Sequence, residues 1–196
     1  IGLDEGVRME TLDRIMRSWG MPMGPVALTD EVGIDVANKV AHIMQEAYPD
    51  RLAFPEWMDR LVEEDRLGSK TGKGLYRYED GKRTEPDEAV YDLLDIPGDR
   101  REVDETALAE RLVLPMVNEA ARCLDEEIVA SPGDIDLALI MGTGFPPFRG
   151  GLCRWADGQG LDRLLEEMER LAETVGERHR PCRALQEIAS RGGFYA

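Results

Sequence analysis

The amino-acid sequence predicts an all-α fold made of two copies of one helical domain. Apolar residues recur at three- and four-residue intervals along most of the 196 residues, which is the spacing of amphipathic helices. The motif Asp-x-x-Gly-x-Asp occurs at residues 30–35 and again at 157–162, with a constant offset of 127 positions. Internal similarity on this scale indicates a repeated structural unit.

The similarity reaches both ends of the two copies. Leu-Asp-Glu at residues 3–5 matches the same triplet at 124–126, and Gly-Leu-Tyr at 74–76 matches Gly-Phe-Tyr at 193–195. A long helix is expected before the second copy, at residues 106–121, and nothing corresponds to it before the first copy. We therefore expect the first copy to be truncated at its N-terminus. The expected domains are a first helical repeat at 1–80, a linker at 81–103 and a second helical repeat at 104–196.

Four helices are expected in the first copy. Gly20, Gly33 and Gly68 are helix stop signals, and Pro25 and Pro55 are suited to the first turn of a helix. Together with the apolar spacing, these signals place the helices at residues 8–19, 25–31, 36–48 and 55–66.

The helix at 36–48 has the clearest amphipathic pattern of the first copy. His42 falls on its polar face, which favours a solvated side chain over a catalytic base. The face that we expect to be buried carries Ala37, Val40, Ala41, Met44 and Tyr48.

A Gly-rich stretch at residues 68–74, Gly-Ser-Lys-Thr-Gly-Lys-Gly, has the composition of a phosphate-binding loop. Its spacing does not fit G-x-x-x-x-G-K-[ST], and no helical pattern follows it. We interpret it as a turn that leads into an extended segment at 76–78. Lys70 and Lys73 remain candidate contacts for an anion.

The linker is charged, contains Pro97 and includes one short helix expected near residues 87–94. In the second copy, Pro115 is expected to kink a long helix, whereas Ser131 and Pro132 provide an N-cap and a first helical residue. The helices of the second copy are expected at 106–123, 132–142, 152–156, 161–175 and 181–190.

Composition argues against several classes of partner and site. A formal net charge of -16 at pH 7 makes nucleic acid and anionic membranes poor partners. No apolar run is long enough to cross a bilayer. Three widely spaced cysteines, Cys123, Cys153 and Cys182, favour reduced thiols and a cytoplasmic location over a disulfide framework. With two distant histidines and no Cys-x-x-Cys, no metal site is expected.

Five motifs follow one another along the chain, and in this order they resemble a known family. They are Asp13 to Pro25 with the core Gly20-Met21-Pro22-Met23-Gly24-Pro25, Leu28-x-Asp30-x-x-Gly33-x-Asp35, Lys70-Thr71-Gly72-x-Gly74-x-Tyr76, Pro115-Met116-Val117-Asn118-Glu119 and Gly142-x-Gly144-Phe145-Pro146-Pro147-Phe148-x-Gly150-Gly151. The set is similar to the tandem C-terminal helical domains of 3-hydroxyacyl-CoA dehydrogenases, above all those of the fatty acid oxidation complex alpha subunit (multifunctional beta-oxidation enzyme). The resemblance covers nearly the whole chain. It implies that each repeat has a fold like the C-terminal domain of 6-phosphogluconate dehydrogenase.

The resemblance implies that the complete enzyme oxidises L-3-hydroxyacyl-CoA to 3-ketoacyl-CoA with NAD. It places NAD on an N-terminal Rossmann domain and proton removal on a His–Glu pair, and neither can be located in this sequence. No G-x-G-x-x-G follows an expected strand, and the family's Asn-Arg position corresponds to Glu110-Arg111 in the second copy. We therefore expect no catalytic residue, no bound cofactor and no turnover by this chain alone.

The loop from Met21 to Pro25 is the candidate substrate-binding segment. In the family, the first helical domain closes over the cofactor domain, and the thioester end of acyl-CoA lies in the cleft. The resemblance thus points to Met21, Pro22, Met23, Gly24 and Pro25, and an apolar loop containing glycine also suits an acyl chain close to backbone. The alternative is that this loop and its counterpart are corners where helices pack. Recurrence of the loop in the second copy favours that alternative.

Two other interpretations of the whole chain remain open. One is a non-catalytic helical scaffold or oligomerisation module, against which the truncated first copy argues. The other is a helical domain of a different beta-hydroxyacid dehydrogenase, against which the doubled motifs argue. The resemblance implies acyl-CoA and the missing Rossmann domain as partners. It leaves a thiolase subunit or a second copy of the chain as further candidates, and it suggests that the second repeat replaces the partner subunit of dimeric relatives.

Overall fold

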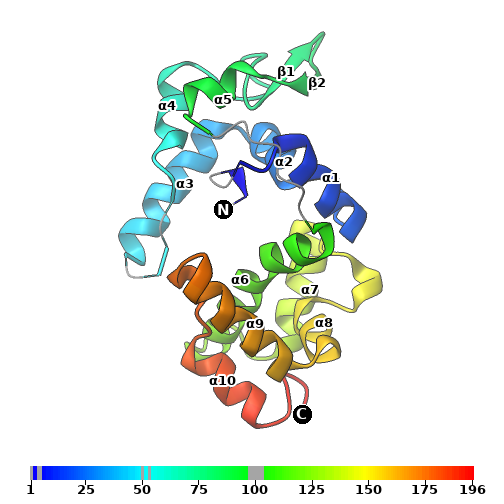
Figure 1. Cartoon of the computed structure of the whole chain (residues 1–196). Coiled ribbons are helices and arrows are strands. Elements are labelled where there is room, and N and C mark those ends of the chain that lie inside the picture. Colours follow the sequence, from blue (N-terminus) through cyan, green and yellow to red (C-terminus); the bar gives the residue numbers. More distant parts are fainter. Residues whose placement is uncertain (1, 4–5, 50, 53, 97–103) are drawn as a thin grey trace. The chain divides into compact units, whose positions relative to one another are not determined.

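A computed structural model describes residues 2–3, 6–49, 51–52, 54–96 and 104–196 (Figure 1). Asp4 and Glu5 of the repeated opening triplet, and residues 97–103 of the expected linker, lie outside the described residues. The described chain is mainly helical, as predicted, and divides into two compact units. The first unit comprises Ile1–Trp19 and Met23–Glu105, and the second comprises Gly20–Pro22 and Thr106–Ala196.

The helices expected in the first copy are confirmed, with ends shifted by a few residues. Gly24 is the N-cap residue of the second helix, where Pro25 takes the first helical position. Gly33, at a φ of 100°, separates the second helix from the third, because this backbone conformation is accessible to glycine at little cost. The helices of the first unit are α1 (Met9–Trp19), α2 (Pro25–Val32), α3 (Ile34–Ala47), α4 (Trp57–Glu63) and α5 (Ala89–Leu93).

A β-hairpin interrupts the helices of the first unit. β1 (Tyr76–Glu79) pairs antiparallel with β2 (Lys82–Pro86) through a turn at Asp80 and Gly81, both of which have positive φ. The sequence predicts the extended segment of β1 but assigns residues 81–103 to a linker. β2 is Lys-Arg-Thr-Glu-Pro and is almost fully exposed, so it lacks the apolar alternation that reveals a half-buried strand. The short helix expected near 87–94 is present as α5.

The inward face of α3 differs from the prediction. Ile34 and Ala41 are buried, but Val40 and Tyr48, which were expected inside, are 52% and 38% exposed. The helix carries apolar residues on two faces, and periodicity alone does not say which face meets the core. By contrast, His42 is exposed as predicted, and its Nε2 lies 2.8 Å from Asp59 Oδ1.

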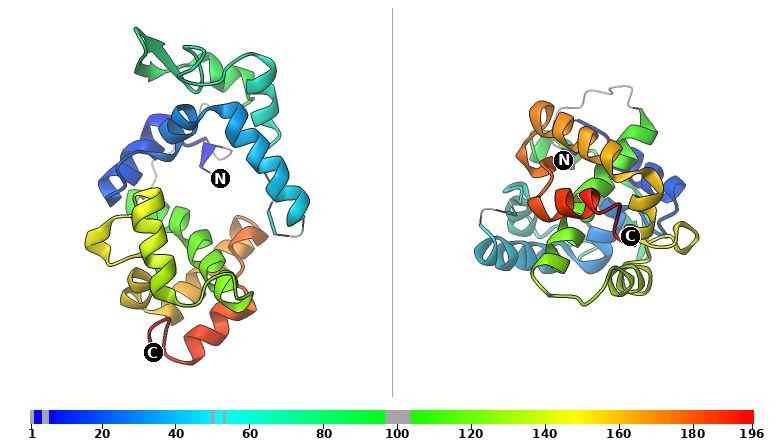
Figure 2. Two further views of the ribbon diagram at one scale, coloured as in Figure 1. Left: turned by 180° about the vertical axis from the view of Figure 1, so that it is seen from behind. Right: turned by 90° about the horizontal axis from the view of Figure 1, so that it is seen from below.

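The second unit is helical throughout its regular elements. Pro115 lies inside its first helix, which continues to Asp125. The predicted N-cap is confirmed, because the Ser131 hydroxyl oxygen accepts a hydrogen bond from the Asp134 amide at 3.3 Å. The helices are α6 (Glu105–Asp125), α7 (Pro132–Thr143), α8 (Leu152–Gln159), α9 (Leu161–Thr174) and α10 (Arg183–Ser190), with short 3-10 turns η2 (Pro147–Arg149) and η3 (Glu177–His179) (Figures 1 and 2).

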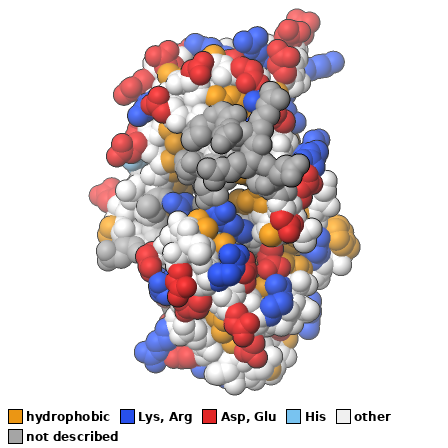
Figure 3. All heavy atoms as spheres, viewed as in Figure 1, with side chains coloured by type: hydrophobic (Ala, Val, Ile, Leu, Met, Phe, Trp, Pro, Cys, Tyr) orange, Lys and Arg blue, Asp and Glu red, His pale blue; other side chains and the backbone are white. Residues whose placement is uncertain are grey.

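Each unit has its own apolar core. In the first, α1 buries Met9, Leu12, Ile15 and Met16 along one stripe. In the second, α9 buries Leu161, Leu164, Met168 and Leu171. Acidic side chains are spread over the face shown in Figure 3, as the net charge requires. Within the described residues, every helix is too short or too polar to span a membrane, and all three cysteines are free thiols.

Candidate functional site

The five residues of the candidate substrate loop do not belong to one unit. Met21 and Pro22 group with the second unit, whereas Met23, Gly24 and Pro25 group with the first. The two prolines are exposed, the two methionines are half-buried and Gly24 is buried. Within each unit the loop therefore contributes one exposed proline and one half-buried methionine, and Gly24 has a different environment.

Gly24 lies directly on the side chain of Asp13 in the first unit. A Cβ atom at position 24 would be 2.2 Å from Asp13 Oδ1 and 2.3 Å from its Cα, so no side chain fits there. The φ of Gly24 is -75°, which any residue can adopt. Glycine is required here by close contact, and the group in contact is a carboxylate of the chain itself.

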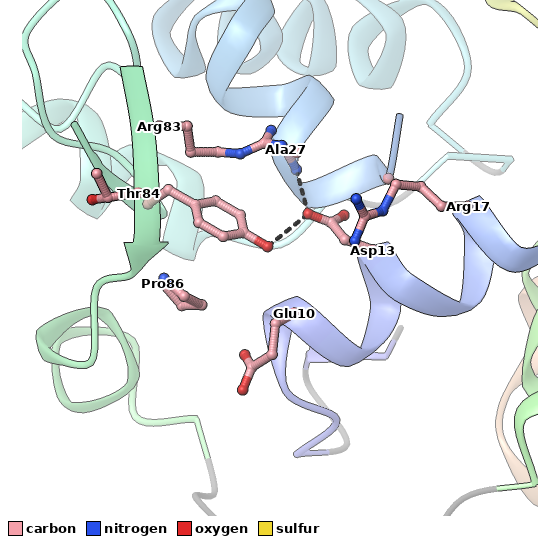
Figure 4. A pocket seen from close by; sticks show the side chains of 9 residues that line it. Glu10, Asp13, Arg17, Ala27, Arg83, Thr84 and Pro86 are labelled. Carbon is pink, nitrogen blue, oxygen red and sulfur yellow. Dashed lines mark hydrogen bonds between the residues drawn. The ribbon is translucent and has the colours of Figure 1, made fainter. Parts of the chain in front are cut away.

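Asp13 is a buried cap for α2. Its Oδ1 accepts a hydrogen bond from the Val26 amide at 2.8 Å. Its Oδ2 accepts from the Ala27 amide at 3.0 Å, as Figure 4 shows. The Tyr76 hydroxyl donates to Oδ2 at 2.7 Å. Burial, and then the hydrogen bond to Asp13, raise the pKa of Tyr76 far above its usual value, so the hydroxyl remains a donor. The carboxylate thus joins α1, the start of α2 and the hairpin.

Asp30, on α2, is a second buried carboxylate of the first unit. It is fully buried and accepts hydrogen bonds from the amides of Leu75 and Tyr76, each at 2.8 Å. Burial raises the pKa of Asp30 above its usual value, although these amides and the Tyr78 hydroxyl oppose the shift. Gly74 lies against this carboxylate as Gly24 lies against Asp13: its Cβ would be 2.4 Å from Asp30 Oδ1.

The second unit repeats the first of these networks. Asp136 accepts hydrogen bonds from the amides of Cys153 and Arg154 at 2.6 and 3.1 Å, and from the Tyr195 hydroxyl at 2.7 Å. A Cβ atom at Gly151 would lie 2.2 Å from Asp136 Cγ. The donors Cys153, Arg154 and Tyr195 therefore correspond to Val26, Ala27 and Tyr76 around Asp13.

The second network is repeated as well. Asp157 accepts hydrogen bonds from the amides of Phe194 and Tyr195 at 2.8 and 3.0 Å. A Cβ atom at Gly193 would lie 2.8 Å from Asp157 Oδ1. The repeated motifs are therefore explained first by architecture. Each copy uses two aspartates and two close glycines to hold its helices and its Gly-x-Tyr segment together, and three of the four aspartates are buried while Asp157 is half-buried.

The remaining polar candidates of the first copy also have structural partners. Lys70 forms an ion pair with Asp35, and Lys73 Nζ donates a hydrogen bond to the Glu64 carbonyl oxygen at 2.9 Å. Both lysines that the sequence offers as anion contacts are thus engaged within the chain. Among the described residues, no group of three His, Cys, Asp or Glu side chains is placed to hold a metal ion.

The two copies differ in chemistry on the outer face of one helix. In α3, Val36, Val40 and Ile43 are 43%, 52% and 55% exposed, and we call these three residues the α3 face. The neighbouring α2 exposes Leu28 and Val32. At the fixed offset of 127, the α3 face corresponds in α9 to Arg163, Glu167 and Arg170.

The charged residues of α9 make the pairs expected of a solvated helix surface. Arg163 pairs with Glu110 at 2.8 Å, and Arg170 pairs with Glu167 at 2.6 Å. The inward positions Ile34 and Leu161, and likewise Ala41 and Met168, are apolar in both copies. The scaffold therefore requires the inner face only, and the apolar α3 face needs a separate explanation.

Comparison with known proteins assigns the family. The family model described as "3-hydroxyacyl-CoA dehydrogenase, C-terminal domain" matches residues 2–78 and again residues 108–195. The fatty acid oxidation complex subunit alpha of Idiomarina loihiensis is 44% identical over 193 residues, which is 97% of this chain and 27% of that protein. The subunit alpha of Vibrio campbellii is 42% identical over 188 residues, covering 95% of this chain and 26% of that protein.

Two solved structures share the fold. The crystal structure of 3-hydroxybutyryl-CoA dehydrogenase from Escherichia coli gives a TM-score of 0.73 at 24% identity and covers 98% of this chain and 56% of that chain. The dehydrogenase part of multifunctional enzyme 1 from C. elegans gives 0.68 at 23% identity, covering 95% and 44%. The chain belongs to the family of 3-hydroxyacyl-CoA dehydrogenase C-terminal domains, and it contains two of them. It spans about a quarter of the length of the curated relatives.

Proposed function

We propose that this chain is the substrate-side and packing portion of an NAD-dependent L-3-hydroxyacyl-CoA dehydrogenase of fatty acid beta-oxidation. The observation that carries the proposal is the family match over both repeats, together with relatives named fatty acid oxidation complex subunit alpha. The boundaries that we propose for the repeats, 1–80 and 104–196, rest on the repeated sequence motifs, although β2 and α5 also fold into the first unit.

The cofactor would be held outside this chain. NAD binds in dehydrogenases on a parallel βαβ unit with a Gly-rich first turn. The strands among the described residues, β1 and β2, are antiparallel, and no helix connects them. The residues present do not fit a dinucleotide, and we derive no catalytic step through NAD. We propose instead that the loop of Met21, Pro22, Met23, Gly24 and Pro25 lines the acyl end of the substrate in the complete enzyme.

We propose that the α3 face is where the cofactor-binding domain packs. An apolar face of three exposed branched side chains is favourable only when another surface covers it. The internal comparison supports this, because the second repeat carries ion-paired residues at the same positions. Two other partners could cover the α3 face, a thiolase subunit or a second copy of this chain. The experiment below distinguishes them from the cofactor-binding domain.

The test is a triple substitution that gives α3 the residues of α9. Val36→Arg, Val40→Glu and Ile43→Arg change exposed side chains only, so the chain is expected to fold normally. Binding to a separately expressed cofactor-binding domain would be measured by analytical ultracentrifugation, with Gln45→Arg, an exposed position of the same helix, as the control. Loss of binding in the triple variant alone supports the proposal. Equal binding by both variants rejects it, and a change in self-association or in thiolase binding alone reassigns the face.

The catalytic part of the proposal has its own test. Isothermal titration would be carried out with NAD and, separately, with acetoacetyl-CoA. We expect no binding of NAD, and binding of acetoacetyl-CoA would mean that this chain holds part of the substrate site by itself. The pure chain should not reduce NAD when it is mixed with a hydroxyacyl-CoA. Reduction of NAD by the pure chain would contradict the proposal. The alternative, a non-catalytic scaffold or oligomerisation module, is favoured by the two repeated aspartate networks. It would be supported if restoring the cofactor-binding domain gave no activity.

A further inference from the structure

The first unit contains a pocket of about 290 Å³ beside the Asp13 cap. α1 contributes Glu10, Asp13 and Arg17, which are spaced by three and four residues and so share one side of the helix. The start of α2 contributes Ala27, and the hairpin contributes Arg83 with its neighbours. Figure 4 shows Arg17 and Arg83 approaching the pocket from different elements, α1 and β2.

The acidic groups of the pocket already have partners. Glu10 Oε1 pairs with Arg8 Nε at 2.5 Å. Asp13 accepts the two amides and the Tyr76 hydroxyl described above, which occupy both of its oxygens. Neither carboxylate therefore needs a further cation from the pocket.

The basic groups of the pocket form no ion pairs among the described residues. Among the described residues, neither Arg17 nor Arg83 forms an ion pair, whereas Arg14 of α1 is paired with Glu105. The Arg83 guanidinium lies over the Tyr76 ring, 5.1 Å from its centroid, which holds it at the pocket by a cation–π contact. The charge of Arg83 also acts on the buried Asp30, whose pKa it lowers. In a chain of net charge -16, two arginines that share a pocket and form no ion pair among the described residues indicate a site for an anion.

The second repeat shows that the scaffold does not require this pocket. Asp13 and Asp136 are 123 positions apart, and the same offset places Ile140 opposite Arg17. At the offset of 127, the small Ala27 corresponds to Arg154, whose guanidinium lies over the Tyr195 ring at 3.7 Å. The first repeat thus has the small Ala27 where the second has Arg154. It has the charged Arg17 where the second has an apolar isoleucine.

We propose that Arg17 and Arg83 bind the phosphate groups of a phosphate ester. Guanidinium groups bind phosphate through two parallel N–H···O bonds, and the pair comes from two elements that Tyr76 and Asp13 hold together. The pocket is at the small end of the range for ligand sites, so it accommodates the phosphate-bearing end of a ligand. The source that we assign is the adenosine phosphate end of coenzyme A, and this assignment rests on the proposed function.

The test separates the two ends of the ligand. The 196-residue chain would be titrated with adenosine 3′,5′-bisphosphate, which carries the phosphates without the thioester, and with acetoacetyl-pantetheine, which carries the thioester without those phosphates. Inorganic pyrophosphate is the third ligand. Binding would be followed by NMR through the arginine Nε–H signals and the amides of α2, in the wild type, Arg17→Gln, Arg83→Gln and Arg178→Gln. Arg178 is an exposed arginine of the second unit without an ion pair among the described residues, so its variant matches the change in charge.

We expect the bisphosphate to shift the Arg17 and Arg83 signals, and either pocket variant to weaken binding about tenfold, with Arg178→Gln unchanged. Affinity should fall with added salt, because both guanidinium groups are open to solvent. No shift with any phosphate ligand, or equal weakening by all three variants, overturns the site. Binding of pyrophosphate without the bisphosphate overturns coenzyme A as the source. Failure of acetoacetyl-pantetheine to bind bears only on the proposed substrate loop.

Discussion

Removing the carboxylate of Asp13 should destabilise the first unit strongly. Asp13→Ala leaves three donors without their acceptor: the amides of Val26 and Ala27 and the hydroxyl of Tyr76. The N-cap residue of α2, Gly24, has no side chain that could replace the lost cap. The change therefore affects the start of a helix and its link to the hairpin together.

The magnitude follows from these contacts. A buried donor that loses its acceptor costs about 1–3 kcal/mol. Asp13 is 5% exposed, but it also lines the pocket described above, so water can reach part of the space that the carboxylate vacates. We therefore take the lower end for each of the three donors, which gives a loss of about 3–4 kcal/mol in the free energy of unfolding.

Equilibrium urea unfolding followed by far-UV circular dichroism would measure this loss. Asp92→Ala is the matched control, because Asp92 is an exposed carboxylate of the same unit and should change stability by less than about 0.5 kcal/mol. A double-mutant cycle with Tyr76→Phe should give a coupling energy of about 1–2 kcal/mol with Asp13→Ala. If Asp13→Ala behaved like Asp92→Ala, the assignment of Asp13 as a cap would be wrong.

Two further predictions test the close glycines and the buried ion pair. Gly24→Ala should lower the free energy of unfolding by more than about 2 kcal/mol, because the added Cβ would overlap Asp13. The control is Gly158→Ala in α8, whose Cβ would meet nothing within 4 Å and which should stabilise the chain by about 0.5–1 kcal/mol. Thermal unfolding would measure both variants, and equal effects would contradict the contact between Gly24 and Asp13. Burial alone would raise the pKa of Asp87, but hydrogen bonds from Arg66 and from its other partners hold it below the usual value. Since the folded pKa lies below the unfolded one, the stabilisation is present above about pH 4 and is lost as the pH falls through the folded pKa. The stability difference between wild type and Asp87→Asn, measured from pH 7 downwards, should therefore shrink in acid, and a constant difference would exclude this linkage.

The two repeats act as controls for each other. Positions that keep their chemistry in both copies, such as Asp13 with Asp136 and Gly24 with Gly151, have partners at corresponding positions in the two units. On the α3 face the chemistry differs, since exposed Val40 corresponds to the ion-paired Glu167. Comparison of the two repeats therefore distinguishes the residues that the fold requires from the residues that are particular to one repeat.

The helices could be predicted from the sequence because their signals are local. Pro25 and Ser131 mark helix starts within one or two residues of the signal itself, and the apolar stripes of α1 and α9 repeat within each helix. The repeat required only a constant offset. These signals lie in residues that are close together in the sequence. The helical fold and the internal repeat could therefore be predicted without knowing which distant residues are in contact.

The partners of the buried aspartates are a different matter. Asp13 receives a proton donor from Tyr76, 63 positions away, and Asp30 receives amides 45 and 46 positions away. The sequence shows the repeated Asp-x-x-Gly-x-Asp, but it does not show that Asp30 is buried while Asp35 pairs with Lys70 at a half-exposed position. It also does not show that Gly24 lies against a carboxylate. Helix periodicity and capping are set by adjacent residues and so are determined by the sequence alone. Which carboxylate is buried, which apolar face stays outside and which arginines share a pocket depend on segments far apart in the chain, and only the tertiary structure brings these together.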